Sequence, residues 1–384
     1  TRRTAYPRAA RWQAIDAAIA SLRRDYDLIV VEGAGSCAEP NLRALDVVNF
    51  GLARRLAAEV HILCDIDKGG VFADILGTLQ VLSLTEPADA ALVRGFLINK
   101  FRGDLKILDG GLDFIRPHLG SASLGVLPYL DLSLEEEDRI RPRRCLHPEI
   151  DIAVLYLPHI ANATDFEHLS VEENVSLRFV RRADELLSPD AIIVPGSKNT
   201  IWDLEYLRRC GLADELLWHA GKTPLVGICG GFEMLGGTLF DPDRTESSAG
   251  SVPGLGLLAV DFAFQRDKLV RPCRYRPSVH NPLSDAGEIE GYEIHTGRPI
   301  YRGALPLFES DTGPDGAIDA ERLIFGSFVH DLWKNPRFTR SFVDWLRVRK
   351  GLTRLSSPLP DHRDRFEQNI ESLADAIEAL GIFR

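Results

Sequence analysis

The stretch Thr223-Pro224-Leu225-Val226-Gly227-Ile228-Cys229-Gly230-Gly231 decides the fold of the second half of the chain. Its apolar residues predict a short buried strand of a parallel sheet, and the residues after Gly231 predict the start of a helix. A cysteine between glycines at such a turn is typical of a nucleophile elbow, because glycine permits a tight backbone and leaves room for a substrate. A helix N-terminus also favours the thiolate form of Cys229. The alternative is a small, inert cysteine packed in a glycine-rich turn.

A histidine far downstream, His330, supplies the second half of the candidate chemistry. Residues 324–330 predict a strand that ends at this histidine, so both side chains are expected at the C-terminal edge of a sheet, where ligands bind. A thiolate with an imidazole in reach can perform covalent acyl transfer, in which the imidazole passes a proton to the leaving group. The oxyanion then needs two N–H donors, and we expect them from Gly230 and from the Pro195-Gly196-Ser197 turn.

Strand and helix patterns alternate along most of the chain, which predicts an α/β protein with parallel sheets covered by helices. In the first part, predicted strands cover 28–31, 60–64, 95–99 and 123–128, and predicted helices cover 12–22, 50–56 and 72–82. In the second part, predicted strands cover 150–155, 175–180, 191–196 and 324–330, a predicted helix covers 200–210, and 252–300 reads as shorter β segments. Residues 131–149 lack an apolar period and are interpreted as a linker, and residues 366–380 predict a helix. We therefore expect four segments: 1–130, the linker 131–149, 150–345 and a C-terminal helical extension, 346–384.

Composition limits the possible functions. The chain has 384 residues and a formal net charge of -11, which gives no general electrostatic basis for binding nucleic acid. No apolar run approaches the roughly 18 residues of a membrane span, and no secretory signal is visible. The six cysteines have neither zinc-site nor disulfide spacing, which favours a reducing cytoplasm.

Polar residues also follow the predicted strands of the first part. Glu32 follows the apolar run 28–31, as a magnesium-binding acid at a sheet edge would, although strand-end acids are frequent. The run Asp65-Ile66-Asp67-Lys68-Gly69-Gly70 suits phosphate or metal contact, or is a plain capped helix start. Asn99 follows the next strand, where it could bind an adenine edge or simply form a turn.

Residues 151–335 resemble a class I glutamine amidotransferase domain, which has a flavodoxin-like fold. The resemblance implies that Cys229 and His330 are catalytic and that Gly196, Gly230, Gly231 and Glu233 form the oxyanion and glutamine site. Two positions depart from the common pattern. Glu233 stands where glutamine is usual, and Leu332 stands where a glutamate usually completes the triad.

Seven motifs extend the resemblance to nearly the whole chain. They are Val31-Glu32-Gly33-Ala34-Gly35-Ser36, Asp65-Ile66-Asp67-Lys68-Gly69-Gly70-Val71-Phe72, Ile98-Asn99-Lys100-Phe101-Arg102-Gly103-Asp104, Asn162-Ala163-Thr164-Asp165-Phe166, Pro195-Gly196-Ser197-Lys198-Asn199-Thr200, Gly227-Ile228-Cys229-Gly230-Gly231 and Gly291-Tyr292-Glu293-Ile294-His295. In this order they resemble the cobyric acid synthases, the glutamine-dependent amidotransferases of the cobalamin pathway.

This resemblance implies a function for each part. The first part would be a dethiobiotin-synthetase-like, P-loop-type domain that binds ATP and Mg²⁺ through Glu32, Asp65, Asp67, Lys68, Gly69 and Asn99. It would phosphorylate a carboxylate of a corrin ring, and ammonia from glutamine would then displace the phosphate. The acceptors would be the b, d, e and g carboxylates of adenosylcobyrinic acid a,c-diamide, and a homo-oligomer is possible.

The family's phosphate loop is not found in this sequence, because no Gly-x-x-x-x-Gly-Lys-Ser/Thr run occurs. The sequence also does not begin with methionine, so we expect a chain that starts after the loop and cannot phosphorylate its substrate alone. Three alternatives stay open at this point. They are an amidotransferase for another carboxylate, a non-catalytic remnant of the fold, and a cysteine hydrolase that uses the same elbow.

Overall fold

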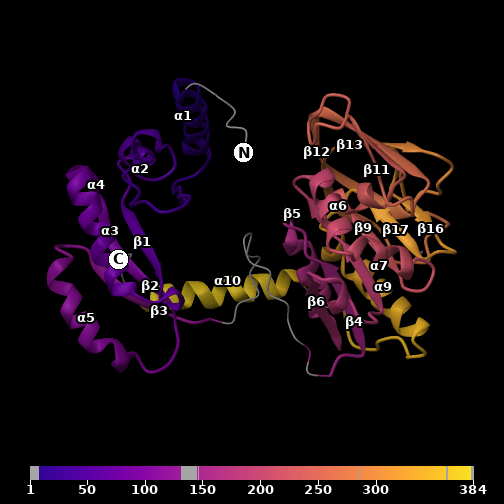
Figure 1. Cartoon of the computed structure of the whole chain (residues 1–384). Helices are drawn as coiled ribbons and strands as arrows, with labels where there is room; N and C mark the ends of the chain where they lie inside the picture. The colour runs from indigo at the N-terminus through magenta and orange to yellow at the C-terminus, as the bar shows by residue number, and fades with distance from the viewer. Residues whose placement is uncertain (1–7, 131–144, 146, 284, 360–361, 382–384) are drawn as a thin grey trace. The chain divides into compact units, whose positions relative to one another are not determined.

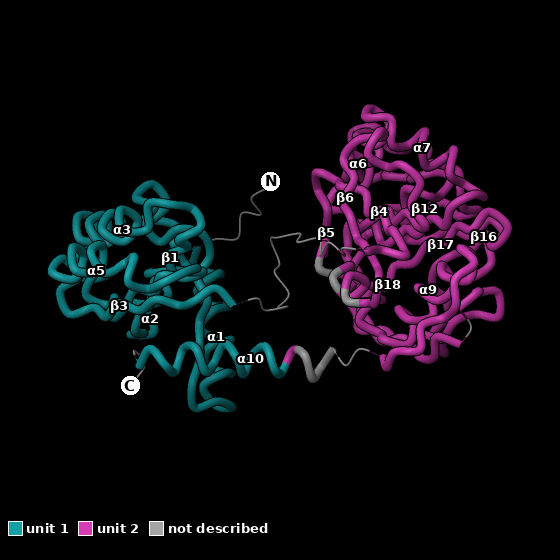
Figure 2. Tube along the Cα trace, turned by 90° about the horizontal axis from the view of Figure 1, so that it is seen from below, with its two compact units in different colours: residues 1–133, 367–384 teal, residues 134–366 magenta. Residues whose placement is uncertain are grey.

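The computed structural model describes residues 8–130, 145, 147–283, 285–359 and 362–381. The chain forms two compact units, which Figures 1 and 2 show. Unit 1 comprises residues 1–133 and 367–384, and unit 2 comprises residues 134–366. Most of the predicted linker, 131–149, lies outside the described residues. Within the described ranges, no helix is long and apolar enough to cross a membrane.

Unit 1 is built on a parallel sheet with the strand order β1-β2-β3. The strands are β1 (Val60–Asp65), β2 (Val93–Phe101) and β3 (Ser123–Pro128). The helices are α1 (Arg8–Asp25), α2 (Phe50–Leu56), α3 (Val71–Thr85), α4 (Pro87–Ala90) and α5 (Asp109–Ile115). The predicted strands at 60–64, 95–99 and 123–128 are confirmed, and so are the three predicted helices. Phe50, Ile75 and Phe96 are fully buried in the core of this unit.

The predicted strand at 28–31 is wrong. The structure forms no strand there, and the side chains of Leu28 and Val30 are 79% and 86% exposed. An apolar run becomes a strand only where a neighbour accepts its backbone hydrogen bonds, and no described strand pairs with this segment. The sheet of unit 1 therefore does not carry Glu32 to its edge.

Unit 2 contains a six-stranded sheet with the order β16-β17-β9-β7-β4-β6. Its strands are β4 (Ile150–Leu155), β6 (Val175–Val180), β7 (Ala191–Val194), β9 (Leu225–Ile228), β16 (Ala317–Asp319) and β17 (Ile324–Ser327). Only β16, at one edge, runs antiparallel to its neighbour. Its helices include α6 (Thr200–Arg209), α7 (Leu212–His219), α8 (Gly230–Leu235) and α9 (Pro336–Arg349). The strands β7 and β9 are buried along their whole length, as their continuous apolar runs predict.

A second, mixed sheet carries the predicted β region 252–300. Its centre is a hairpin of β12 (Val260–Pro277) and β13 (Ile289–Tyr301), joined by β10 (Thr238–Phe240), β11 (Ser251–Pro253), β14 (Phe308–Ser310), β15 (Gly313–Asp315) and β18 (Val329–His330). The β structure is confirmed, but the expectation of short segments is wrong. The register shifts between Phe264 and Leu269, and this bulge interrupts the apolar alternation that would have marked one long strand.

The predicted strand 324–330 divides between the two sheets. β17 ends at Ser327 in the parallel sheet, and β18 places His330 opposite Tyr292 of β13. Asp315 fixes this crossing, because its carboxylate accepts hydrogen bonds from the Ser327 hydroxyl at 2.5 Å and the Phe328 amide at 3.3 Å. The nucleophile and the histidine therefore stand on different sheets.

The C-terminal region is helical, as predicted, with α10 covering His362–Glu378. The expected segment boundary after residue 345 falls inside α9, which runs without a break to Arg349. The residues of α10 from Glu367 onward belong to unit 1. The division into four segments stays a prediction.

Asp315 is expected to make stability depend on pH. Burial raises its pKa to about 7, although the Ser327 hydrogen bond lowers it. Because the folded pKa lies above the ordinary value of 3.8 for an aspartate, this contribution to stability is complete below that ordinary value and is lost as pH rises through the folded pKa. Between pH 5.5 and 8 the loss is on the order of 2 kcal/mol. Asp315→Asn, which cannot ionise, should remove it in urea unfolding measured at both pH values.

The control for this prediction is Asp311→Asn, which changes an exposed carboxylate in the preceding turn. It should retain the pH dependence of the wild type. An Asp315→Asn variant that loses as much stability between the two pH values as the control does would contradict the prediction.

Candidate active site

The elbow predicted around Cys229 is present. Cys229 follows β9, precedes α8, and has a φ of 51° and a ψ of -112°, a backbone conformation that non-glycine residues rarely adopt. Its side chain is 7% exposed, and the thiol lies 3.6 Å from the carbonyl oxygen of Ile294 on β13. A strained, nearly buried cysteine at the edge of a parallel sheet is the geometry of a nucleophile elbow.

Glycines make the elbow possible by close packing. A Cβ on Gly231 would lie 1.9 Å from the carbonyl oxygen of Val194, and a Cβ on Gly227 would lie 2.7 Å from the Leu235 side chain. Gly231 therefore lets α8 sit directly on the end of β7. The structure gives Gly231 a packing role, and its predicted part in glutamine binding stays a prediction.

Gly231→Ala is expected to destabilise unit 2 by about 3 kcal/mol or more, because the new methyl group meets rigid backbone. Gly77→Ala is the control. Gly77 lies within α3 and a Cβ there would meet nothing within 4 Å, so alanine should stabilise the helix by about 0.5–1 kcal/mol. Thermal unfolding of both variants checks the prediction, which an unchanged Gly231→Ala transition would contradict.

His330 is held by a carboxylate from another part of the chain. Its ring is 1% exposed, and Nδ1 lies 2.7 Å from Oδ2 of Asp165 and 3.0 Å from Nδ2 of Asn162. The ring of Tyr292 stacks on the imidazole with a centroid distance of 5.2 Å. No nitrogen or oxygen of the described residues pairs with Nε2 of His330, so this nitrogen is the one left to move protons.

Leu332 stands where a glutamate is usual, and Asp165 provides a carboxylate beside His330 instead. It lies in the 3₁₀ segment Ala163–Val171 and is 3% exposed. Besides Nδ1 of His330, it accepts a hydrogen bond from the backbone amide of Asp331 at 3.2 Å. A buried carboxylate on Nδ1 orients the imidazole and stabilises its protonated form. The site is therefore a Cys-His-Asp triad.

The three triad residues determine where the proton resides. Burial lowers the pKa of His330, but the hydrogen bonds to Asp165 and Cys229 and the charges of both residues raise it to about 10. Burial raises the pKa of the Cys229 thiol, and the hydrogen bonds to His330 and the Gly230 amide oppose that effect. Asp165 thus favours a protonated imidazole, while burial keeps the pKa of the Cys229 thiol above its ordinary value.

The predicted oxyanion residues Gly196 and Gly230 lie beside Cys229. A Cβ on Gly196 would lie 3.4 Å from Cε1 of His330 and 3.6 Å from Cβ of Cys229. A Cβ on Gly230 would lie 2.9 Å from the backbone nitrogen of Ser197. The structure therefore brings the Gly196-Ser197 turn and the Gly230 amide together beside the thiol, and their role as oxyanion donors stays a prediction.

Glu233 is buried one helical turn after Cys229 and is 2% exposed. Its Oε2 accepts a hydrogen bond from the Thr200 hydroxyl at 2.7 Å, and the Gly297 amide also donates to it. Burial and the nearby Glu246 carboxylate raise the pKa of Glu233 to about 8. A neutral carboxyl group can donate and accept hydrogen bonds, as the usual glutamine amide does.

The structure brings only some of the predicted nucleotide residues of unit 1 together. Asp65, the last residue of β1, is opposite Asn99 of β2, and Lys100 pairs with Asp65 at 2.8 Å. Asp67 pairs with Arg102. Lys68 is exposed, and Gly69 has a φ of 73° with nothing within 4 Å of its Cβ position. Glu32 lies in an exposed coil, and among the described residues no group of His, Cys, Asp and Glu side chains is arranged to hold a metal ion.

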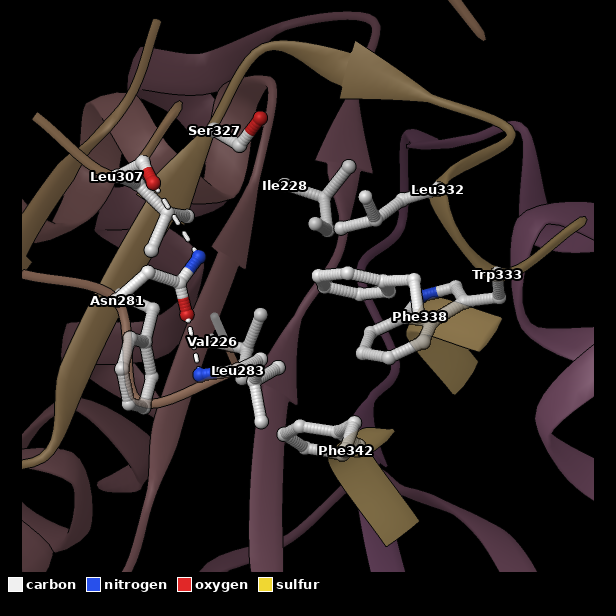
Figure 3. A pocket seen from close by; sticks show the side chains of 11 residues that line it. Val226, Ile228, Asn281, Leu283, Leu307, Ser327, Leu332, Trp333, Phe338 and Phe342 are labelled. Atoms are coloured by element: carbon white, nitrogen blue, oxygen red, sulfur yellow. Dashed lines mark hydrogen bonds between the residues drawn. The ribbon is translucent and has the colours of Figure 1, made fainter. Parts of the chain in front are cut away.

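A cavity lies between β9 and α9 (Figure 3) and is not part of this site. Figure 3 shows Val226 and Ile228 of β9 facing Phe338 and Phe342 of α9 across it. The Asn281 amide in its wall already bonds to Leu307 at 3.2 Å and to Leu283 at 2.9 Å. The lining of the cavity is mainly apolar and includes no triad residue. We therefore interpret the cavity as a gap in core packing.

Sequence reasoning missed two residues of the site. Asp165 belongs to the motif 162–166, but no spacing in the sequence links it to His330, which lies on a different element. Tyr292 was likewise only a motif residue, and its stacking on His330 follows from the pairing of β13 with β18. For both residues, the available signal in the sequence is that each lies in a polar motif to which no role is assigned.

Comparison with known proteins identifies unit 2 as a glutamine amidotransferase domain. Residues 151–338 match the family model described as the CobB/CobQ-like glutamine amidotransferase domain. Cobyric acid synthase from Desulforamulus reducens is 43% identical over 94% of this chain and 72% of its own length. Those from Photorhabdus laumondii and Clostridium botulinum are 42% and 40% identical, over 95% and 93% of this chain and 74% and 72% of their own lengths. The chain belongs to the cobyric acid synthase family.

Proposed function

We propose that this chain hydrolyses glutamine at Cys229 and supplies ammonia for the amidation of corrinoid carboxylates in cobalamin biosynthesis. The observation that supports the proposal is the triad of Cys229, His330 and Asp165. Family membership supports the choice of acceptor, which we propose to be the b, d, e and g carboxylates of adenosylcobyrinic acid a,c-diamide.

We propose the following chemistry at the triad, which its geometry supports. The Cys229 thiolate attacks the side-chain carbonyl of glutamine, and the Gly230 amide with the Gly196-Ser197 turn stabilises the oxyanion. His330 gives its proton to the departing ammonia, and Asp165 stabilises the imidazolium before that transfer. Water activated by His330 then hydrolyses the thioester to glutamate.

Unit 1 is proposed to hold ATP at the edge that carries Asp65, Asp67, Lys68, Gly69 and Asn99. The open glycine bend before α3 and the cations Lys68 and Lys100 suit an anion. ATP would convert the acceptor carboxylate into an acyl phosphate, which ammonia can displace. Mg²⁺ is expected with the nucleotide, and Glu32 as its ligand stays a prediction, as does a homo-oligomer.

The cytoplasm is the proposed location. All six cysteines are free, and free thiols are usual in a reducing compartment.

Labelling with a diazo-ketone analogue of glutamine tests the glutaminase assignment. We expect one adduct by intact mass on the wild-type chain and none on Cys229→Ser. Cys64→Ser is the matched control, because Cys64 is also 7% exposed and burial raises its pKa to about 11. This control should be labelled like the wild type. A wild-type chain that takes no label would favour a non-catalytic remnant, and a chain labelled equally by analogues unrelated to glutamine would favour a cysteine hydrolase.

A further inference from the structure

A buried carboxylate outside the triad is tied to the turn that faces Cys229. Asp203 lies in the first turns of α6 and is 0% exposed. Its Oδ2 accepts a hydrogen bond from the Ser197 hydroxyl at 2.6 Å, and its Oδ1 lies 2.9 Å from Nδ1 of His159. The backbone amide of His159 also donates to Oδ2, at 3.2 Å. Both oxygens of this carboxylate are thus occupied.

These contacts join two loops that meet beside the active site. β5 (Ile160–Ala161) pairs with β8 (Gly196–Ser197), and the amide of Lys198 donates to the carbonyl oxygen of His159 at 2.7 Å. The Asp203 carboxylate makes hydrogen bonds to both sides of this short ribbon, to Ser197 on one side and to His159 on the other. Such a two-residue ribbon has few hydrogen bonds of its own, so a buried acceptor shared by both loops restrains it strongly.

The restrained turn is the one that packs on the nucleophile. Ser197 contributes the nitrogen that lies 2.9 Å from the Cβ position of Gly230, and the Cβ position of Gly196 lies 3.4 Å from Cε1 of His330 and 3.6 Å from Cβ of Cys229. A displacement of Ser197 would therefore move the turn relative to the Gly230 amide. Stabilisation of an oxyanion depends on donors fixed at about 2.7–3.1 Å from the oxygen, so a small displacement has a large cost in rate.

We propose that Asp203 is a positioning residue that holds the Gly196-Ser197 turn in the geometry required to stabilise the oxyanion at Cys229. The inference rests on the proposed glutamine hydrolysis. Asp203 acts through Ser197 and His159 and touches neither the thiol nor the triad imidazole. Its loss should affect the transition state more than the binding of glutamine, because only the transition state carries the oxyanion.

Asp203→Asn is the direct test, since it keeps the shape but replaces one acceptor oxygen by an NH₂ group that cannot accept a hydrogen bond. Within this 384-residue chain we expect kcat for glutamine hydrolysis to fall 10- to 100-fold while KM changes less than threefold. A glutamine analogue with an aldehyde in place of the carboxamide adds the thiol across its C=O bond and places the new oxygen in the oxyanion site. Its inhibition constant should rise by the same factor as kcat falls.

Alkylation of Cys229 by iodoacetamide separates this role from damage to the triad, because alkylation forms no oxyanion. Its rate should stay within twofold of wild type. The control is Glu205→Gln, which removes an exposed carboxylate of the same helix. Among the described residues its ion-pair partner is Arg208, and the change should leave kcat, KM and alkylation unchanged.

Ser197→Ala keeps the proposal testable if Asp203→Asn fails to fold, because it removes the same hydrogen bond from the other side. We expect about a tenfold fall in kcat, and the double variant should lose little more than Asp203→Asn alone. Values of kcat and aldehyde inhibition within threefold of Glu205→Gln would overturn the proposal. A wild-type chain that neither hydrolyses glutamine nor reacts with the diazo-ketone analogue would instead overturn the proposed function itself.

Discussion

Cys229→Ala is expected to reduce glutamine hydrolysis by about 10⁴-fold or more, to the level of the uncatalysed background, because no other group of the triad can form the thioester. The measurement is glutamate release from glutamine under saturating conditions. Cys64→Ala, which removes an equally buried thiol from unit 1, should retain the wild-type rate. An active Cys229→Ala variant would show that the elbow is not the site of hydrolysis.

The same variant also tests the division of labour between the two units. In a preparation that catalyses amidation, ammonium chloride is expected to support the reaction of Cys229→Ala, since ammonia bypasses the glutaminase step. If the ammonia-dependent reaction is lost together with the glutamine-dependent one, the assignment of separate roles to the two units is wrong.

Asp165→Asn is expected to have the second largest effect. The asparagine side chain cannot stabilise a charged imidazole, so the pKa of His330 should fall and less of Cys229 should be thiolate. We expect kcat to fall by about 10²–10⁴-fold, the range associated with the loss of a carboxylate that orients a catalytic histidine. Iodoacetamide should also alkylate Cys229 more slowly at pH 7, which a simple loss of glutamine binding would not cause.

The matched control for this variant is Asp344→Asn. Asp344 is also buried in unit 2. Its Oδ1 accepts a hydrogen bond from the Leu355 amide at 2.8 Å, which an asparagine oxygen can keep. It should leave both the hydrolysis and the alkylation rates unchanged. If Asp165→Asn keeps a kcat within threefold of this control, Asp165 is not a member of the triad.

The sequence predicted the parts of the site that depend on local pattern. Apolar β-branched runs identify buried strands such as β7 and β9, and glycines beside Cys229 identify the elbow, because only glycine accepts the close packing there. Asp165 could not be predicted in the same way. Its contact with His330 depends on the path of the 3₁₀ segment Ala163–Val171, which lies far from His330 in the sequence.

The errors have physical reasons of the same kind. The run 28–31 has the composition of a strand, but a strand forms only where a neighbour offers hydrogen bonds. The apolar run 324–330 looks continuous, although the chain changes sheets at Phe328 because Asp315 holds Ser327 and the Phe328 amide. In both cases the outcome depends on a partner distant in the sequence.

The crossing from β17 to β18 has a consequence for the newly made protein. The ribosome completes the cysteine elbow long before it adds His330, and the histidine reaches the thiol only after β18 has joined the β12–β13 hairpin. A chain in which β18 is not paired therefore carries the Cys229 thiol without the imidazole beside it. The proposed hydrolysis of glutamine therefore requires the pairing of β18 with β13, and a chain that lacks this pairing would leave the nitrogen donor of the cell intact.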